Sequence, residues 1–216
     1  MIAITFAHPS ESRDFLRLVG GRHHELKILH TGIGAKACRQ SIGPFLQSHP
    51  FRLVISSGFA GGLDDSLVPG DLLLVENYSD PQLLAEAQEL IIARTGRLVS
   101  ADRVLERAAE RRTFASEHQA VAADMETECI AEACAARQLP LLSLRVISDT
   151  PQRPLPAPAK VLFDFERQRT AAGRLGRYLL THPFAVVRLV RFSRQIASAR
   201  SELAVGLKAL VEEFAE

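Results

Sequence analysis

The stretch Ala122–Asp149, AADMETECIAEACAARQLPLLSLRVISD, decides the fold of this chain. It begins with an acidic turn, continues with a helical pattern and ends with an apolar strand. Glu126 lies at the opening of the predicted helix, and Asp149 lies where the strand gives way to the proline-rich segment TPQRPLPAP. Ligands bind outside the carboxyl ends of strands in open α/β sheets, so both carboxylates are candidate site residues.

Outward from this stretch, apolar strands alternate with helical patterns. The predicted strands are Ile2–Ala7, Glu25–Thr31, Arg52–Gly58 and Leu72–Glu76. Such alternation predicts an α/β fold with a mostly parallel central sheet flanked by helices. We expect Ser10 or Ser12 to cap the first helix, Gly58–Gly62 to form a glycine-rich turn, and Ser79 or Asp80 to cap a helix that runs to Thr95.

The pattern changes to helix only from Lys160 onward, with a break at His182-Pro183. We therefore expect an α/β domain over residues 1–160 and a helical C-terminal extension over residues 161–216, packed on or beside it. Arginines make this extension locally basic. Two interpretations stay open: amphipathic helices that cover the sheet or contact a second subunit, and a basic amphipathic surface that touches a membrane or a lipid-like ligand.

Composition limits the partners of the protein. Its 216 residues hold 26 Lys+Arg and 25 Asp+Glu, so no global field attracts nucleic acid or an anionic membrane, and any such attraction would have to be local. The cysteines Cys38, Cys129 and Cys134 lack a metal or disulfide spacing and are typical of reduced core thiols. The N-terminus has no signal-peptide pattern, and no run reaches the roughly 18 apolar residues of a spanning helix. These features predict a cytoplasmic protein.

The sequence lacks the residues that several common types of site require. Gly32–Ala37 fits the G-x-G-x-x-A form of a dinucleotide fingerprint, but the next strand ends in Ser56-Ser57-Gly58 without the carboxylate that would hold a ribose. NAD binding is therefore a less favoured alternative. No nucleophile elbow and no H-E-x-x-H motif is present. We expect no cofactor and no metal.

Three carboxylates remain at turn positions: Glu11, Glu126 and Asp149. Cleavage of a glycosidic bond needs such groups to activate water, to hold the sugar and to protonate the leaving group. Each also has a purely structural interpretation. Glu11 could be a first-turn helix acid, Glu126 a capping partner, and Asp149 the Asx residue of the following turn.

The order of motifs along the chain resembles the purine nucleoside phosphorylase and nucleosidase superfamily, and within it the methylthioadenosine/S-adenosylhomocysteine nucleosidase branch. The motifs are Thr31-Gly32-Ile33-Gly34, Ser57-Gly58-Phe59-Ala60-Gly61-Gly62-Leu63, Pro69-Gly70-Asp71, Asp124-Met125-Glu126 and Arg145-Val146-Ile147-Ser148-Asp149. Arg153-Pro154-Leu155-Pro156 and the basic helices look like the hopanoid-associated subgroup, whose proposed role is removal of adenine from adenosylhopane.

The resemblance implies a role for each matched residue. Glu11 corresponds to the water-activating glutamate and Asp149 to the aspartate that donates a proton to purine N7. Glu126 corresponds to the ribose-binding glutamate, Met125 to the methionine against the sugar, and Arg145 to a support for the acidic cluster. The base-binding positions are Phe59, Ala60, Gly61, Val104 and Ser148.

The chain also departs from the family pattern. Val104 stands where nucleosidases usually carry an aromatic that stacks on the base, and the connection from Glu76 to Asp80 is short. No arginine lies within residues 55–62 to hold phosphate, which favours water as the nucleophile, although Arg13 and Arg39 leave phosphate open. The resemblance thus implies hydrolysis of an adenine nucleoside by a homodimer. The alternatives are a phosphorylase and a catalytically inactive nucleoside-binding protein of the same fold.

Overall fold

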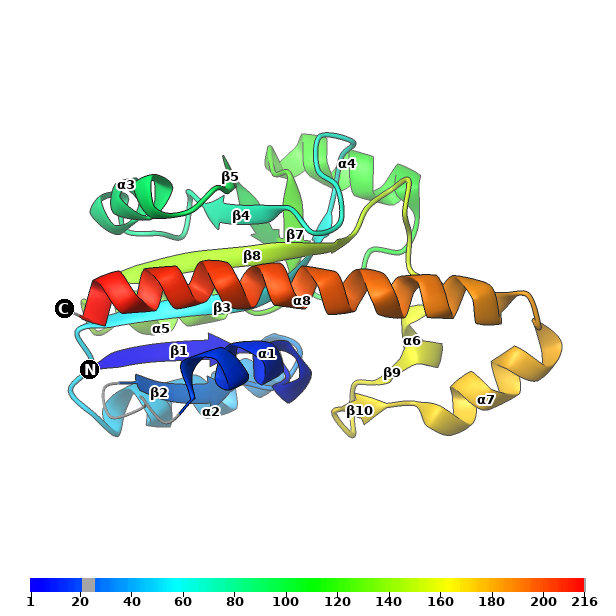
Figure 1. Cartoon of the computed structure of the whole chain (residues 1–216), viewed down its shortest axis with the longest axis horizontal. Coiled ribbons are helices and arrows are strands. Elements are labelled where there is room, and N and C mark those ends of the chain that lie inside the picture. The colour runs from blue at the N-terminus through cyan, green and yellow to red at the C-terminus, as the bar shows by residue number, and fades with distance from the viewer. Residues whose placement is uncertain (21–25, 216) are drawn as a thin grey trace.

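A computed structural model describes residues 1–20 and 26–215 of the chain. Within these residues it contains an eight-stranded sheet, a separate two-stranded sheet, and helices on both faces of the large sheet (Figure 1). The elements in chain order are β1 Ile2–Phe6, α1 Pro9–Val19, β2 Leu26–His30, α2 Ala35–Gln47, β3 Leu53–Gly62, β4 Leu72–Val75, α3 Pro81–Leu90, β5 Arg94–Gly96, β6 Leu98–Ser100, α4 Ala108–His118, β7 Ala122–Asp124, α5 Thr127–Ala135, β8 Leu141–Asp149, α6 Ala159–Leu162, β9 Phe163–Asp164, β10 Arg169–Thr170, α7 Ala172–Thr181 and α8 Ala185–Ala215.

The large sheet has the strand order β2-β1-β3-β8-β4-β5, and β7 joins β6 to β3. Five of its strand pairs are parallel, and the pairs β4/β8 and β3/β7 are antiparallel. The predicted fold class, an α/β protein with a mostly parallel central sheet, is confirmed. Because β1, β3 and β8 are parallel neighbours, their carboxyl ends meet at one edge of the sheet.

The predicted glycine turn at Gly58–Gly62 is wrong, because these residues belong to β3. β8 pairs with β3 as far as Gly61, and β7 pairs with Gly61 and Gly62 on the other side. The register shifts by one residue between Ala60 and Gly61. Such a bulge bends the strand. Ala60 and Gly61 therefore lie on a hydrogen-bonded strand rather than on a free turn.

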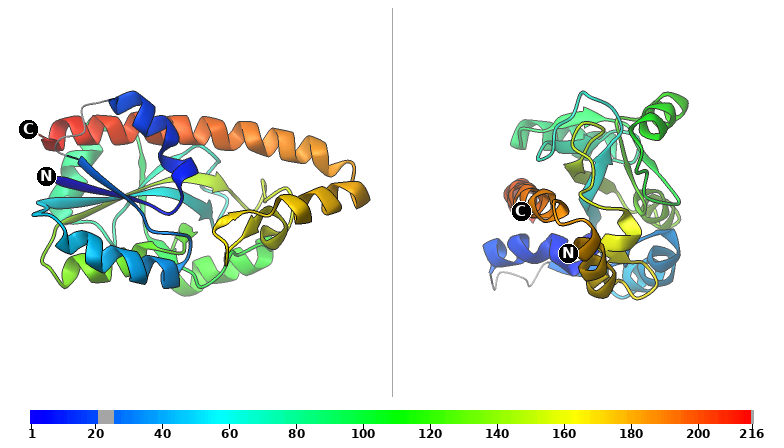
Figure 2. Two further views of the ribbon diagram at one scale, coloured as in Figure 1. Left: turned by 90° about the horizontal axis from the view of Figure 1, so that it is seen from below. Right: turned by 90° about the vertical axis from the view of Figure 1, so that its right-hand side faces the viewer.

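The two faces of the sheet carry different helices (Figure 2). One face packs against α1, α3 and α8, and its core includes Phe6, Phe15, Leu144 and Leu207. The other face packs against α2 and α5, with the buried thiols of Cys38, Cys129 and Cys134 in its core. The three cysteines are thus core residues, as their sequence context predicts.

Local signals explain most helix boundaries, with two corrections: one cap and one helix end. His8, not Ser10 or Ser12, caps α1: its ring accepts from the Ser10 amide, while Glu11 reaches back to the His8 amide. Asp80 caps α3 as predicted, accepting from the amides of Gln82 and Leu83. That helix ends at Leu90 rather than Thr95, because the following residues pair with β4 as β5.

The C-terminal segment is not purely helical. A two-stranded antiparallel pair, β9 and β10, follows α6, and the α7/α8 pair follows in turn. The second half of α8 belongs to the core of the α/β body, and its Arg200 forms an ion pair with Asp14 of α1 at 2.6 Å. No helix among residues 1–20 and 26–215 is long and apolar enough to cross a membrane. The division at residue 160 stays a proposal.

Candidate active site

A pocket of about 230 Å³ opens at the carboxyl ends of β1, β3 and β8. It is lined by all of the predicted catalytic, ribose-binding and base-binding residues, which are Glu11, Phe59, Ala60, Gly61, Val104, Met125, Glu126, Ser148 and Asp149. Positions separated by up to 138 residues in the chain therefore meet in one cavity, as the motif order predicts. Arg145 lies outside this cavity and underneath it.

Glu11 lines the pocket and is almost fully buried. Its carboxylate accepts hydrogen bonds from the amides of Ala7 and His8, at 2.9 and 3.0 Å, and from the amide of Phe59 at 3.2 Å. Burial raises the pKa of Glu11, and the amides and the Arg145 charge partly offset that rise. A carboxylate whose pKa is raised above its ordinary value is a stronger base and is suited to accept a proton from water.

Asp124 lines the pocket and forms a buried ion pair with Arg145 at 3.1 Å. The same guanidinium donates to the hydroxyls of Ser56 and Thr127, at 2.7 and 2.6 Å. Asp124 in turn accepts from the Ser100 hydroxyl and from the amide and hydroxyl of Thr127. This network anchors the turn that carries Met125 and Glu126, so the predicted support by Arg145 acts through Asp124.

Glu126 is the N-cap residue of α5, and its carboxylate reaches across to α2. There it accepts a hydrogen bond of 2.5 Å from the amide of Gly34, the N-cap of α2. Gly34 has a φ of 92°, a left-handed conformation that favours glycine. Burial, and then the neighbouring Asp124 charge, raise the pKa of Glu126 to about 8. The same hydrogen bond occupies the amide of the second glycine in the G-x-G-x-x-A motif.

This raised pKa predicts a pH-dependent stability. Between its ordinary pKa of 4.5 and about 8, folded Glu126 keeps a proton that the unfolded chain releases, so stability falls as pH rises through that window. Glu126→Gln removes the titrating group. Across this pH window the variant should lose less stability than the wild type. We expect the two losses in free energy of unfolding to differ by at least about 1 kcal/mol, which corresponds to about 2–4 °C in melting temperature.

Thermal unfolding at a series of pH values measures this difference. The matched control is Glu128→Gln, which removes an exposed carboxylate from the same helix and is expected to follow the wild-type curve. If Glu126→Gln and the wild type lose stability in parallel as pH rises, Glu126 does not hold a proton in the folded state.

Asp149 lies at the end of β8 and is 4% exposed. Arg111 of α4 donates to its Oδ2 atom, and the Ser148 hydroxyl lies within hydrogen-bond distance of its Oδ1 atom and of the Ala60 carbonyl. Arg111 also donates to the carbonyls of Leu105, at 2.7 Å, and Gly62, at 3.1 Å. The pocket therefore has a carboxylate whose orientation is held by a buried guanidinium.

The sequence interpretation missed Arg111 and Asp124 as site residues. Asp124 could have been found, because it sits in the same motif as Met125 and Glu126. Arg111 lies between Arg107 and Arg112 in a short helix, and no residue pattern separates it from them. Only the packing of α4 against the end of β3 makes it the buried one.

The side of the pocket that holds the predicted base-binding residues Phe59 and Val104 is apolar. Val104 and Phe59 line it together with Leu63 and Leu155. Val104 is aliphatic, so among these four side chains Phe59 alone has an aromatic ring. The short Glu76–Asp80 connection is held in place by Asn77, whose side chain bonds the amide and carbonyl of Leu98 at 2.9 and 3.0 Å.

A larger groove of about 980 Å³ adjoins the pocket. Ile33, Arg103, Val104 and Met125 line both cavities, so the two are continuous on the side of Met125. The outer wall of the groove comes from the segment before α7, where Gln168 accepts from the Ile33 amide at 2.7 Å and donates to the Ile33 carbonyl at 3.0 Å. The pocket and groove together leave room for a ligand larger than a simple nucleoside.

Solved structures share this fold over nearly the whole chain. The futalosine hydrolase of Helicobacter pylori strain 26695 superposes with a TM-score of 0.72 at 20% identity, over 98% of this chain and 97% of that one. A 5'-methylthioadenosine/S-adenosylhomocysteine nucleosidase of H. pylori gives a TM-score of 0.72 at 19% identity, over 98% and 97% of the chains. These likenesses show that the chain shares the α/β fold of these two proteins.

Sequence comparison places the chain more closely. A family model described as the phosphorylase superfamily matches residues 74–182, and the chain belongs to this superfamily. The 5'-methylthioadenosine/S-adenosylhomocysteine nucleosidase of Staphylococcus saprophyticus is 28% identical over 162 residues, which cover 60% of this chain and 71% of that enzyme. The resemblance predicted from the motifs is confirmed at the level of the superfamily.

Proposed function

We propose that the protein hydrolyses the N-glycosidic bond of a purine nucleoside. The observation that carries this proposal is the convergence of Glu11, Glu126 and Asp149 on one pocket at the carboxyl edge of the sheet. The relatives similar in sequence bear the name of a nucleosidase, which supports the same reaction class.

Each side chain has a proposed part in the reaction. Glu11 takes a proton from the attacking water, and Glu126, with Met125 packed on the sugar, holds the ribose hydroxyls. In the free protein the Asp149 carboxylate is paired with Arg111 through Oδ2. Oδ1, beside Ser148, is therefore the atom that would take up a proton from solvent when the nucleoside binds and deliver it to purine N7. As the bond to the base breaks, its electrons pass to the purine, which leaves as the neutral base.

Water is the proposed nucleophile, with phosphate as the runner-up. Arg13 and Arg39, which left phosphate open, are exposed on α1 and α2, pair with Asp14 and Glu132, and are not among the residues that line the pocket. Arg145 is committed to Asp124. Among the described residues, Arg103 and Arg111 are the pocket-lining cations, and Arg111 is occupied by Asp149.

The adjoining groove favours a nucleoside with a bulky 5′ substituent, because it opens beside Met125, where the sugar is proposed to lie. Methylthioadenosine, S-adenosylhomocysteine and adenosylhopane are the candidate substrates, and they fill the groove to increasing extents. Groove volumes of this order are typical of small-molecule sites, about 300–1,000 Å³. The homodimer and the cytoplasmic location predicted from the sequence belong to this proposal, as does contact of the C-terminal helices with lipid.

Adenine release from these three nucleosides, measured with and without inorganic phosphate, tests the proposal. We expect adenine from at least one of them at a rate that phosphate does not change. A rate that rises with phosphate, together with a sugar phosphate product, would move the function to the phosphorylase. No release from any nucleoside would support the inactive binding protein.

A further inference from the structure

The α7 helix and the first half of α8 form a helical hairpin that projects from the α/β body (Figure 1). We call residues 172–198 the arginine hairpin. No side chain of α7 is buried, and within the described part of the chain α8 has no buried residue from Val186 to Ser198. The core contacts of α8 start at Ala199. Near the body, α7 packs against α6 and Gln195 donates to the Ser148 carbonyl at 2.7 Å. The outer part of the hairpin is therefore a surface without a partner among the described residues.

Large apolar side chains gather at the tip of the arginine hairpin. Leu180 and Phe184, on either side of the turn between the helices, are 86% and 88% exposed. Val186, Val187 and Val190 follow on α8, and with two arginines they line a shallow groove of about 360 Å³. Contiguous exposed apolar residues of this kind mark an interaction surface.

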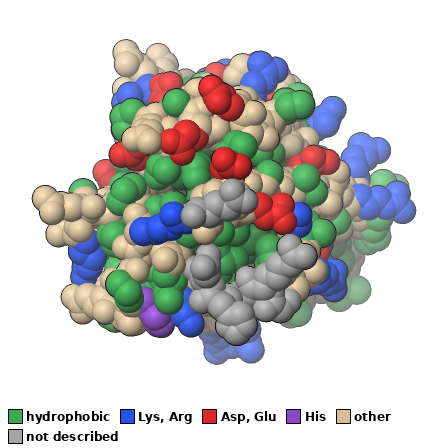
Figure 3. All heavy atoms as spheres, turned by 60° about the vertical axis from the view of Figure 1, so that its left-hand side comes forward, with side chains coloured by type: hydrophobic (Ala, Val, Ile, Leu, Met, Phe, Trp, Pro, Cys, Tyr) green, Lys and Arg blue, Asp and Glu red, His purple; other side chains and the backbone are tan. Residues whose placement is uncertain are grey.

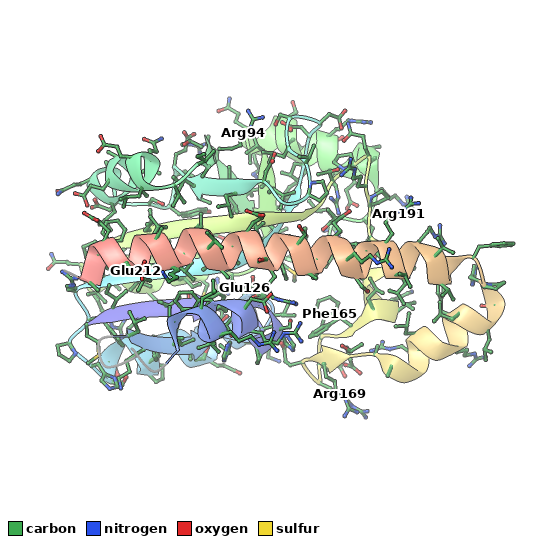
Figure 4. The ribbon with its side chains drawn as sticks, in the orientation of Figure 1. Arg94, Glu126, Phe165, Arg169, Arg191 and Glu212 are labelled. Atoms are coloured by element: carbon green, nitrogen blue, oxygen red, sulfur yellow. The ribbon has the colours of Figure 1, made fainter. Side chains whose placement is uncertain are left out.

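Positive charge surrounds this tip. From Arg167 through Ser201 the sequence has eight arginines and no Asp or Glu, and five of these arginines lie in the hairpin. Arg174 pairs with Asp164, whereas none of the ion pairs among the described residues involves Arg177, Arg188, Arg191 or Arg194. Figure 4 shows Arg191 on the half of α8 that leads to the hairpin turn, and Glu126 within the body.

The remainder of the chain is acidic by comparison, because the whole chain has a net charge of only +1. On the face that carries both termini, acidic and basic side chains are interspersed (Figure 3). The charge of the protein is therefore polarised toward the hairpin.

We propose that the arginine hairpin binds the surface of an anionic lipid bilayer, with Phe184 and its apolar neighbours in the interface and the arginines on the headgroup phosphates. An apolar tip with a basic surround matches both parts of that interface. Each arginine near such a surface contributes about 1 kcal/mol. A second copy of this chain is the less suitable occupant, because a two-fold contact would bring the same arginines together.

Docking of the hairpin would bring the substrate groove close to the bilayer. α7 packs against α6, and the segment from α6 to Gln168 forms the outer wall of the groove. A nucleoside with a lipid tail could then meet the groove while its tail stays in the membrane. This consequence rests on the proposed function, whereas membrane binding itself does not.

Sedimentation of the full chain with vesicles tests the inference. We expect binding to phosphatidylcholine vesicles that contain phosphatidylglycerol, weakened by salt, and little binding to phosphatidylcholine alone. Arg188→Gln combined with Arg191→Gln should lower the affinity about thirtyfold, from the loss of about 2 kcal/mol. Phe184→Asp should lower it by a further tenfold or more, and it disturbs no core contact because Phe184 is exposed.

Two variants on the body serve as matched controls. Ile92→Asp changes a fully exposed apolar residue, and Arg94→Gln an exposed arginine, both far from the hairpin in sequence. Both should bind vesicles as the wild type does. The inference is overturned if the controls lose vesicle binding to the same extent as the hairpin variants, or if the wild type does not bind vesicles. A wild-type dimer in light scattering that Phe184→Asp converts to a monomer, without vesicle binding, would assign the hairpin to a subunit contact instead.

Adenine release from soluble methylthioadenosine separates this inference from the proposed function. Every hairpin variant should retain the wild-type rate, since none touches the pocket. If the hairpin variants lose vesicle binding but keep the wild-type rate, the hairpin is a docking element. If every protein is inactive, the proposed function fails, and the vesicle experiment still decides whether the hairpin binds a membrane.

Discussion

Asp149→Asn is expected to slow catalysis by orders of magnitude while nucleoside binding persists. Loss of a general acid typically costs 10²–10⁴ in rate, so we expect kcat to fall about a thousandfold. The Asn side chain has nearly the same shape, and its carbonyl oxygen can still accept a hydrogen bond from Arg111. The variant should therefore fold and bind the nucleoside, which a titration of the inactive protein would measure.

A nucleoside analogue with a leaving group that needs no proton, such as a nitrophenyl riboside, sharpens this experiment. If Asp149 protonates the purine, the variant should cleave the analogue nearly as well as the wild type does. The matched control is Asp65→Asn, an exposed carboxylate outside the pocket. Wild-type purine release by Asp149→Asn would contradict the assigned role, and equal loss on both substrates would indicate a structural role.

Arg111→Met is expected to be the most destabilising single change at the site. It leaves Asp149 as a buried charge without its partner and removes the donor to the carbonyls of Gly62 and Leu105. Breaking a buried ion pair in this way costs about 3–5 kcal/mol. Urea unfolding measures the change, and Arg112→Met is the matched control, because the neighbouring Arg112 is exposed and its ion pair with Asp65 is on the surface.

The double variant Arg111→Met with Asp149→Asn tests whether the unpaired charge of Asp149 causes the loss of stability. Replacing the carboxylate by an amide removes the unpaired charge, so the double variant should be more stable than Arg111→Met alone. The pair does not organise the site if the two changes have additive effects on the free energy of unfolding, or if Arg111→Met destabilises the protein as little as Arg112→Met does.

Much of the fold could be predicted because its signals are local. The β1 strand is a short apolar run, and Asp80 is a standard helix cap, so both are readable from neighbouring residues. The extension of β3 through Gly58–Gly62 could not be predicted in this way. Glycines there indicate a turn by themselves, and only pairing with β7 and β8 makes them a strand.

In the candidate site, too, local sequence patterns predict some residues, whereas long-range contacts determine others. Glu126 and Asp149 stand at element ends, which the residue pattern of their own stretch predicts, and the structure places both in the pocket. Glu11 comes from the other end of the chain. Its turn position made it a candidate, and the resemblance gave it the role of activating water. Arg111 depends on a long-range contact between α4 and the end of β8 that leaves no trace in the local sequence.

The continuity of α8 has a consequence for how the protein is made. Leu203, Leu207 and Leu210, near the end of a single 31-residue helix, fill the core beside strands formed by the first residues of the chain. That face of the sheet is covered only in part, by α1 and α3, until α8 emerges from the ribosome. We expect the nascent chain to depend on chaperones during that interval, since exposed strands with long-range partners fold slowly and aggregate readily.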